Sequence, residues 1–529
     1  MILLHKLHKS FGHQTLLKEA SFHCPQNARV ALVGNNGTGK TTLLNILCGF
    51  DKEFEGDIIK PKELRLGYLP QIVNQDPKPT LLEETLTGAK RLNTIMAERH
   101  AILHDMAAGV FSEALYDRYD YVEGQFNALN GYRVEEDARD LLRGFGFKDT
   151  QFDQPVTQLS GGWRMRVELA KMLLDEPNFL ILDEPTNHLD LPSIEWFQSY
   201  LKKFQGTILF VSHDKDLLNH LATHVLHLRS GKLTAYTGNF DAFLEAFTLK
   251  QTQNEQASKN LQQQYTHIEQ FVNRFRAKPS KARQVQSRLK TLAKIQALED
   301  SIEFENMDDT MMLALQNPKP SGKEVLKVDH LAIGYAQPLV KNLTFTVHRG
   351  QRIAILGANG LGKSTLLKSF LGKIPALSGT ATFGHNVSIG YFAQEHLEGL
   401  KEGVSVFENI QRAAPAMPEM QARRLLAMLG LRGDAVFKPI RVLSGGEKNR
   451  TALACLLATQ PNTLFLDEPT NHLDLSACEI LANALADFSG TVFFVSHNKA
   501  FIETVATHIL YLKEKGPMRL EEVCDFQER

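Results

Sequence analysis

The chain has 529 residues, 43% of them hydrophobic and 22% charged, which is ordinary for a globular protein and too long for a single core. Its formal net charge of -1 excludes a global attraction to nucleic acid or membrane, so any basic surface must be local. Five scattered cysteines without a C-x-x-C pair suggest neither a disulfide framework nor a zinc site. No apolar run approaches the ~20 residues of a membrane-spanning helix. We therefore expect a cytoplasmic protein, because the opening residues MILLHKLHKSFGH also hold too short an apolar run for a signal peptide.

A glycine-rich loop of the pattern G-x-x-x-x-G-K-[ST] follows a short apolar strand that ends at Val33. Glycines let backbone N–H groups turn toward phosphate oxygens, the lysine reaches the β and γ phosphates, and the next hydroxyl can bind Mg²⁺. Apolar residues after the loop indicate a helix, which completes the strand–loop–helix setting of a phosphate site. The residues predicted to hold nucleotide here are Gly34, Asn35, Asn36, Gly37, Thr38, Gly39, Lys40, Thr41 and Thr42.

Two single side chains extend this nucleotide site. Phe11, in the turn text KSFGH, can stack on an adenine ring, although a packed turn aromatic is the alternative. Gln71 ends GYLPQ at a strand-to-loop junction, where an amide suits a metal or water ligand that must also move. Tyr335 and Gln394 hold the corresponding places in the second half of the chain.

The text LSGGWRMRVELA indicates a helix that opens at a second phosphate-binding element. Ser160 stands where it can cap this helix, which begins at Gly161 and Gly162. The unpaired N–H groups of a helix start attract a phosphate, so these three residues are predicted to contact nucleotide.

The run FLILDEPTNHLD, from Phe179 to Asp190, predicts a buried parallel strand that delivers two carboxylates at its end. Asp183 suits a Mg²⁺-bound water and Glu184 suits an attacking water. His213 ends the next strand, in FVSHD, and can contact the γ phosphate and the attacking water.

Every one of these motifs returns in the second half, which makes a chance origin untenable. The repeated phosphate loop comprises Gly357, Ala358, Asn359, Gly360, Leu361, Gly362, Lys363, Ser364 and Thr365. The repeated helix start comprises Ser444, Gly445 and Gly446, and the repeated strand ends carry Asp467, Glu468 and His497. The residues predicted to serve the metal in the two sites are Thr41, Gln71, Asp183, Ser364, Gln394 and Asp467.

The spacing of the two copies locates an insertion. The lysines of the phosphate loops lie 323 positions apart, as do the two glutamines, whereas the serines, the glutamates and the histidines lie 284 positions apart. The first half therefore carries 39 additional residues, which we place near residues 92–131 as a helical arm. A longer loop or a hairpin without a partner is the alternative.

A long linker, residues 243–322, separates the halves. Its glutamine-rich text predicts an exposed helix, Pro279 breaks it, and VQSRLKTLAKIQALED resumes helical spacing, so we expect an antiparallel hairpin with its tip near Ala277 to Lys281. No acidic residue lies between Gln270 and Leu298, and such a basic patch suits the phosphates of folded RNA, a solvated charged hairpin being the alternative. Residues predicted to contact RNA are Arg274, Arg276, Lys278, Lys281, Arg283 and Arg288.

With these motifs in this order, the chain resembles the ATP-binding cassette ATPases. Two cassettes in one chain, LSGGWRMR, DEPTNHLD twice and a long charged linker are similar to the ABC-F branch, and within it to the bacterial YbiT-type proteins. The resemblance implies an α/β fold with two P-loop cassette domains, each with a parallel-sheet core, a helical subdomain and an antiparallel β subdomain, joined by a helical hairpin. The implied domains are residues 1–242, 243–322 and 323–529.

The resemblance also implies two ATP sites with Mg²⁺, each closed by the LSGG helix of the other half. It implies a monomer without a transmembrane partner that contacts the ribosome, with its hairpin reaching ribosomal RNA and the peptidyl-site tRNA and its arm also touching the ribosome. Three alternatives stay open: the fused twin ATPase of a membrane importer, a DNA-repair cassette protein, and a ribosome-protecting antibiotic-resistance factor of the same branch. The first usually lacks a long basic hairpin, and the second carries cysteine clusters or much longer coiled coils.

Overall fold

The structure is a computed structural model, which describes residues 2–11, 14–69, 79–109, 111–187, 189–275, 281–301, 319–335, 338–393, 399–471, 473–513 and 520–523. The chain divides into two compact units, one formed by Met1–Ala235 with Met312–Arg529 and the other by Tyr236–Met311. The larger unit contains both motif-bearing halves, and the smaller one is the helical linker.

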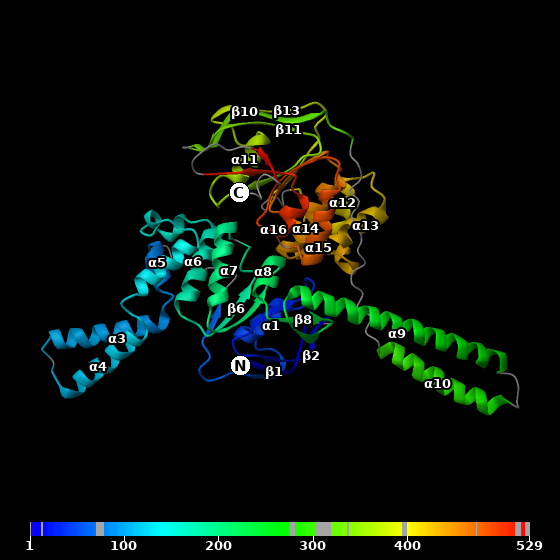
Figure 1. Ribbon diagram of the computed structural model, residues 1–529, viewed down its shortest axis with the longest axis horizontal. Helices are drawn as coiled ribbons and strands as arrows, with labels where there is room; N and C mark the ends of the chain where they lie inside the picture. Colours follow the sequence, from blue (N-terminus) through cyan, green and yellow to red (C-terminus); the bar gives the residue numbers. More distant parts are fainter. Residues whose placement is uncertain are drawn as a thin grey trace. The chain divides into compact units, whose positions relative to one another are not determined.

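The first half is built on a six-stranded sheet in the order β5-β6-β7-β3-β8-β9, in which β5, β6, β7, β3 and β8 pair in parallel. Its strands β6 and β8 are labelled in Figure 1. Its strands are β3 (Arg29–Val33), β5 (Leu66–Tyr68), β6 (Phe179–Asp183), β7 (Thr207–Val211), β8 (His224–Arg229) and β9 (Lys232–Thr237). A smaller antiparallel sheet comprises β1 (Ile2–Phe11), β2 (Gln14–Cys24) and β4 (Glu55–Ile59). Its helices include α1 (Lys40–Cys48), α2 (Leu81–Leu86), α5 (Val134–Gly144), α6 (Gly161–Leu174), α7 (Leu191–Lys203) and α8 (Lys215–Leu221).

The second half repeats this plan, with a sheet in the order β14-β15-β16-β12-β17-β18 and an antiparallel sheet in the order β11-β10-β13. The first sheet contains β12 (Arg352–Leu356), β14 (Ile389–Phe392), β15 (Thr463–Asp467), β16 (Thr491–Val495), β17 (His508–Tyr511) and β18 (Leu520–Glu522). The second contains β10 (Glu324–Gly334), β11 (Pro338–His348) and β13 (Ser378–Phe383). The helices are α11 (Lys363–Phe370), α12 (Val406–Ala413), α13 (Glu419–Met428), α14 (Gly445–Ala458), α15 (Leu475–Ala486) and α16 (Lys499–Val505).

The apolar runs of the sequence form the centre of these sheets. Four residues of β6 and all five of β7 are buried, and every residue of β15 and β16 is buried. Strands covered on both faces read as continuous apolar runs, and each fully buried leucine or phenylalanine contributes roughly 1.5–3 kcal/mol. These buried strands fix the positions of the polar residues that follow them.

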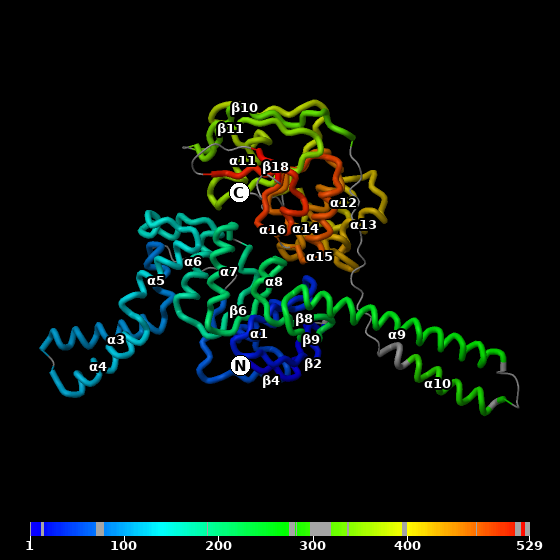
Figure 2. The backbone as a smooth tube through the Cα atoms, viewed as in Figure 1, coloured from blue at the N-terminus to red at the C-terminus, as the bar shows by residue number. Residues whose placement is uncertain are grey.

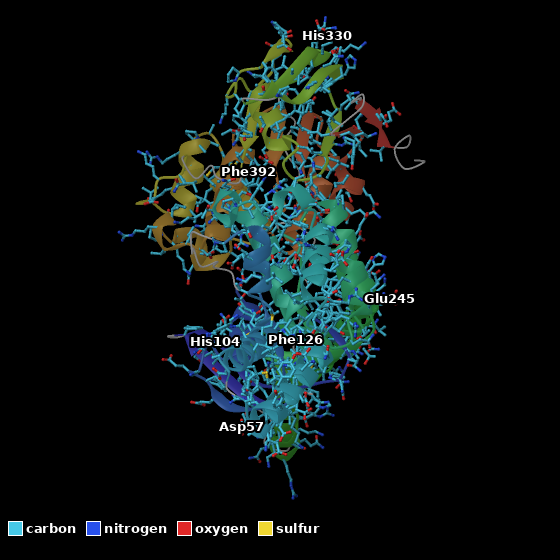
Figure 3. The ribbon with its side chains drawn as sticks, turned by 90° about the vertical axis from the view of Figure 1, so that its left-hand side faces the viewer. Asp57, His104, Phe126, Glu245, His330 and Phe392 are labelled. Atoms are coloured by element: carbon cyan, nitrogen blue, oxygen red, sulfur yellow. The ribbon has the colours of Figure 1, made fainter. Side chains whose placement is uncertain are left out.

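The inserted arm is a pair of helices, α3 (Lys90–Ala107) and α4 (Glu113–Ala128), which has no counterpart among the described residues of the second half. Figure 2 shows the two helices running beside each other away from the sheet. Arg99 Nε donates to Glu123 Oε2 at 2.6 Å, which joins the helices to each other. At the base of the arm, Ala89, Leu92 and Phe126 form a small buried cluster (Phe126 is labelled in Figure 3).

The smaller unit consists of two helices that pack against each other, α9 (Phe240–Phe275) and α10 (Ala282–Ser301). Asn239 begins α9, because its side-chain oxygen accepts from the backbone N–H of Ala242 at 3.0 Å. The seam between the helices contains Val272, Val285 and Leu292. Of the residues predicted to form the tip, Ala277 to Lys281, only Lys281 lies in the described part of the chain.

None of the helices in the described ranges is long and apolar enough to cross a membrane.

Replacing Phe126 with alanine is expected to loosen the arm without disturbing the sheets. The substitution leaves a cavity in a cluster of three buried residues, and removal of a buried phenylalanine costs about 3–5 kcal/mol. Amide hydrogen exchange over residues 90–128 should accelerate at least ten-fold, while exchange of β6 and β7 stays unchanged. Phe111→Ala, at an exposed position between the arm helices, serves as the matched control. Equal acceleration in the arm and in the central strands would contradict this independence.

Candidate nucleotide sites

The first phosphate loop connects β3 to α1, and its lysine is anchored beneath it. Lys40 is the first residue of α1, is buried, and donates from Nζ to the carbonyl oxygens of Gly34 at 2.7 Å and Asn35 at 3.1 Å. A Cβ atom at Gly34 would lie 2.4 Å from the carbonyl oxygen of Leu228, so only glycine fits there. Lys363 repeats the arrangement, with Nζ donating to the carbonyl of Gly357 at 2.8 Å. Both loops therefore present a lysine amine at their centre.

Thr41 and Asp183 meet at the end of β6, as their predicted common role requires. The Thr41 hydroxyl donates to Asp183 Oδ2 at 2.9 Å. A hydroxyl and a carboxylate are the oxygen ligands that Mg²⁺ prefers, so these two residues fit that ion. In the second half, Ser364 and Asp467 line one common cavity. Gln71 and Gln394, also predicted to serve the metal, lie outside the described residues.

Each predicted glutamate lies at a strained turn directly after its strand. Glu184 has a φ of 49° and Glu468 a φ of 51°, in the left-handed region that such residues rarely adopt. The strain is held by the neighbouring strand, because the N–H of Glu184 donates to the carbonyl of Val211 at 3.0 Å and that of Glu468 to the carbonyl of Val495 at 3.0 Å. Strained backbone of this kind concentrates at functional sites.

A histidine accompanies each glutamate. The backbone N–H of His213 donates to Glu184 Oε2 at 3.2 Å, and His213 Nε2 lies 3.4 Å from Glu184 Oε1. In the second half, His497 Nε2 lies 3.2 Å from Glu468 Oε1. The structure thus brings together both pairs that the sequence placed on separate strands.

Burial dominates the titration of these groups. It raises the pKa of Glu184 to about 8 and that of Glu468 to about 7, in each case assisted by the adjacent aspartate. It lowers the pKa of His213 to about 4 and that of His497 to about 3. Burial also lowers the pKa of Lys40, against the opposing effect of Glu184. A site with these values is built to receive compensating charge.

Two cavities contain these groups. The first, of about 520 Å³, is lined by Lys40, Thr41, Asp183, Glu184 and His213. Its lining residues all belong to the first half, so the predicted contribution of Ser444 and Gly446 is not among them. The second half reaches this site electrostatically, because Asp474 and Arg450 act on the pKa of Lys40 and His213.

The second cavity, of about 490 Å³, is shared between the halves. Ser160, Gly162 and Trp163 of the first half line it together with residues of the second. The second-half residues that line it include Tyr335, Asn359, Gly360, Gly362, Lys363, Ser364, Thr365, Asp467, Glu468 and His497. The arrangement predicted for the second nucleotide is therefore present as a cavity.

Sequence reasoning missed the residues that join the halves at this cavity. Asp190 Oδ2 accepts from the backbone N–H of Asn359 at 2.8 Å and lies 3.5 Å from the guanidinium of buried Arg166. The signal was present, because Asp190 and Asp474 end both copies of the DEPTNHLD text. Only the structure shows that Asp190 accepts a hydrogen bond from the phosphate loop of the other half.

The predicted N-cap position of Ser160 is confirmed, but the prediction that its side chain caps α6 is wrong. Ser160 occupies the N-cap position, but its side chain makes no capping hydrogen bond. A capping box needs glutamate or glutamine three residues on, and Trp163 stands there. The corresponding Ser444 does cap α14, with Glu447 as its partner.

The remaining predicted residues lie at the surface. The rings of Phe11 and Tyr335 are 55% and 67% exposed, and Lys9 Nζ lies 4.8 Å from the Phe11 ring centre. Of the residues predicted to contact RNA, Arg274 lies at the end of α9. Arg283 and Arg288 are exposed on α10, and half-buried Lys281 directly precedes that helix. The Arg288 guanidinium lies 5.0 Å from the ring centre of Phe271, so this aromatic helps to pair the helices. Arg276 and Lys278 lie outside the described residues.

Comparison with known proteins agrees with this geometry. The sequence matches the family described as ABC transporter over residues 17–187 and 340–471, and again, through the linker, over 226–310. It is 39% identical to the Bacillus subtilis ATP-binding protein YdiF, covering 97% of this chain and 80% of that protein. It is 34% identical to the Escherichia coli ATP-binding protein YheS, covering 97% and 78%. With ATP-binding cassette sub-family F member 3 of Mus musculus it shares 35% identity, covering 97% and 71%.

Solved structures share the fold. The RNase-L Inhibitor superposes with a TM-score of 0.61 at 17% identity, covering all of this chain and 92% of that one. An archaeal ribosome recycling factor, solved with the archaeal ribosomal stalk protein aP1, superposes with a TM-score of 0.62 at 18% identity, covering 100% and 91%.

Two phosphate loops, each with a buried Asp-Glu strand end and a following histidine, define a twin-cassette P-loop ATPase. The chain belongs to the ATP-binding cassette family, in its sub-family F, and it binds and hydrolyses ATP. The predicted α/β fold with two such cassettes is confirmed. The narrower likeness to YbiT-type proteins, the domain boundaries and the individual site residues stay predictions.

The double variant Glu184→Gln/Glu468→Gln is expected to be more stable than the parent protein at alkaline pH. Because the pKa of each carboxyl is raised in the folded state, ionisation destabilises the fold progressively above pH ~4.5. The full loss of stability is reached only above pH of about 8 for Glu184 and about 7 for Glu468. Calorimetry without nucleotide should give a Tm higher by at least about 2 °C at pH 8.5 and nearly unchanged at pH 5.

The matched control is Glu195→Gln/Glu479→Gln, which changes one exposed helical glutamate in each half. An equal rise at both pH values, or the same rise in the control, would contradict the assignment of buried ionisation at Glu184 and Glu468.

Proposed function

We propose that this protein binds the ribosome in an ATP-closed state, regulates translation and dissociates upon ATP hydrolysis. The observation that carries the ATP-dependent part is the duplicated site, because both halves retain the lysine, the buried glutamate and the histidine. Twin cassettes often retain one complete site only, so two complete sites favour a cycle in which both nucleotides matter.

Within each site we assign roles from position. Lys40 and Lys363 neutralise phosphate charge, and Glu184 and Glu468 accept a proton from, and orient, the attacking water. His213 and His497 hold the glutamate and contact the γ phosphate. Thr41 with Asp183, and Ser364 with Asp467, would hold Mg²⁺, which supplies charge stabilisation at the phosphates when bound. The phosphate loops and the exposed rings of Phe11 and Tyr335 would bind the rest of the nucleotide.

Closure follows from the shared second cavity. A nucleotide on Lys363 would lie against Ser160 and Gly162 of the other half, and its γ phosphate could contact both. ADP lacks that group, so ATP and ADP would favour different arrangements of the halves. We infer that the first nucleotide is likewise completed by Ser444 and Gly446 upon closure.

The ribosomal part of the proposal rests on the basic helical unit. Arg283, Arg288, Lys290 and Lys294 lie exposed on α10, in a stretch without acidic residues. Such a surface binds phosphates without sequence preference, as ribosomal RNA or the peptidyl-site tRNA would require. One structural neighbour is an archaeal ribosome recycling factor and another is a ribosome-bound assembly of archaeal Pelota and ABCE1, which supports the ribosome as partner. We also propose that the arm touches the ribosome and that the protein acts as a monomer.

The double variant Glu184→Gln/Glu468→Gln should stay on ribosomes in the presence of ATP. It keeps the size and hydrogen bonding of the side chains but removes the base, so closure occurs without release. Sucrose-gradient sedimentation of a cell extract should place most of the variant with ribosomes in ATP and much less in ADP. The Glu195→Gln/Glu479→Gln control should sediment as the parent does. A variant found free in ATP, or recovered with membranes as an importer ATPase would be, contradicts the proposal.

Charge reversal on α10 should weaken ribosome binding while ATP hydrolysis persists. In the trapped background, Arg283→Glu/Lys290→Glu removes two cations from exposed positions and is expected to raise the Kd for ribosomes at least ten-fold and to lower its salt dependence. Lys250→Glu/Lys259→Glu makes the same charge change on exposed positions of α9, outside the basic stretch. Equal losses in both variants would indicate a non-specific charge effect and contradict the assigned surface.

A further inference from the structure

The two helices that we propose to close the nucleotide sites differ at the third position of their first turn. Both α6 and α14 begin after a serine and two glycines, and their third helical residues are Trp163 and Glu447. The third residue of a helix can reach back to the N-cap, and an anion bound at a helix start uses the same N-cap groups. The difference therefore bears on the phosphate-binding end of each helix.

In α14, the serine is fully engaged by the glutamate. The Ser444 hydroxyl donates to Glu447 Oε2 at 2.7 Å, and its backbone N–H donates to the same oxygen at 2.8 Å. The N–H of Glu447 in turn donates to Ser444 Oγ at 3.3 Å. A negatively charged oxygen thus occupies the donors that a γ phosphate would use.

In α6, this competition is absent. The Ser160 side chain makes no capping hydrogen bond. The Trp163 ring is held by its neighbours, since the Arg166 guanidinium lies 4.3 Å from its centre and the Phe147 ring 4.8 Å away. Ser160, Gly162 and Trp163 all line the cavity that contains Lys363.

A phosphate approaching Ser444 must therefore displace a carboxylate and experience its repulsion, whereas one approaching Ser160 does neither. Replacing the hydrogen bond from Ser444 to Glu447 by one to a phosphate changes the free energy little. The affinity for phosphate is therefore decided by the repulsion between phosphate and the Glu447 carboxylate and by the loss of the capping box. Both terms disfavour phosphate at α14 and vanish at α6.

We propose that Glu447 competes with the γ phosphate of ATP for Ser444, and that Trp163 relieves Ser160 of such competition, so the two ATP sites are unequal. The site on Lys363, closed by α6, binds ATP more tightly, and the site on Lys40, closed by α14, is the weaker one. Glu447 acts as a positioning residue for the serine. The inference rests on the proposed head-to-tail sharing of each ATP between the halves.

The test measures ATP affinity at one site at a time. In the non-hydrolysing Glu184→Gln/Glu468→Gln protein, Lys363→Ala leaves the Lys40 site intact, and Lys40→Ala leaves the Lys363 site intact. Equilibrium dialysis with radiolabelled ATP then gives the Kd of the remaining site. Two changes are made at α14, Glu447→Gln and Glu447→Trp, and one reciprocal change at α6, Trp163→Glu.

Both Glu447 variants should lower the Kd of the Lys40 site by about three- to ten-fold, as expected for removal of one competing charged hydrogen bond. They should leave the Kd of the Lys363 site within about two-fold of its starting value. Trp163→Glu should raise the Kd of the Lys363 site by a similar factor and spare the other. Glu447→Gln keeps a residue able to form a capping box, so its Tm should match that of the parent protein. A purely structural role would move the Tm and leave the site-specific affinities equal.

The inference is overturned if Glu447→Gln and Glu447→Trp leave the Kd of the Lys40 site unchanged, or if they change both sites equally. Failure of the proposed function is seen separately, in a parent protein whose glutamate variants do not accumulate on ribosomes. Trapping on ribosomes together with unmoved affinities would refute only the inequality of the two sites.

Discussion

The structure depends on a glutamate held in left-handed backbone at the end of a buried strand. The hydrogen bond from Glu184 N–H to the carbonyl of Val211 ties this turn to the neighbouring strand, and Glu468 with Val495 repeats it. Because β6 and β7 pair in parallel with Asp183 opposite Val211, the turn emerges beside the histidine that follows β7. Sheet register, rather than local propensity, therefore places base and histidine within 3.4 Å of each other.

Placing charge at that point opposes stability. The side chains of Glu184 and Glu468 are only 19% and 14% exposed. Their pKa values are raised because Lys40 and Lys363, which lower them, offset only part of the desolvation. A fold selected for stability alone would place apolar residues there. The buried strands on either side compensate, since β7, β15 and β16 have no exposed residue. The nucleotide site thus lowers the stability of the fold locally, and the buried strands of the sheet provide the stability that tolerates it.

The features that occur in both halves could be predicted from the sequence alone. The buried strands, both phosphate loops and the glutamate–histidine pairs follow from apolar runs that end in polar motifs, and the repeat excluded chance. The extra helices of the arm followed from a change in spacing, and the helical linker from its composition. Contacts that depend on how the halves pack did not follow, such as Asp190 with the N–H of Asn359. The side-chain cap expected of Ser160 is not formed, although Ser112 caps α4 with a leucine three positions later, so the sequence motif alone could not decide this hydrogen bond.

The missing side-chain cap of α6 marks a position at which the two halves differ. Their sheets, loops and strand ends are matched so closely that the halves would be expected to bind nucleotide equally. At the helix starts, however, α14 satisfies its own N-cap through Glu447, whereas α6 leaves that function to whatever occupies the cavity. A helix end without an internal cap is satisfied by water or by a ligand, and beside a phosphate-loop lysine the ligand that we propose is the γ phosphate of ATP. A symmetric fold can therefore carry two different helix starts, because capping is decided by single side chains while the fold is decided by many.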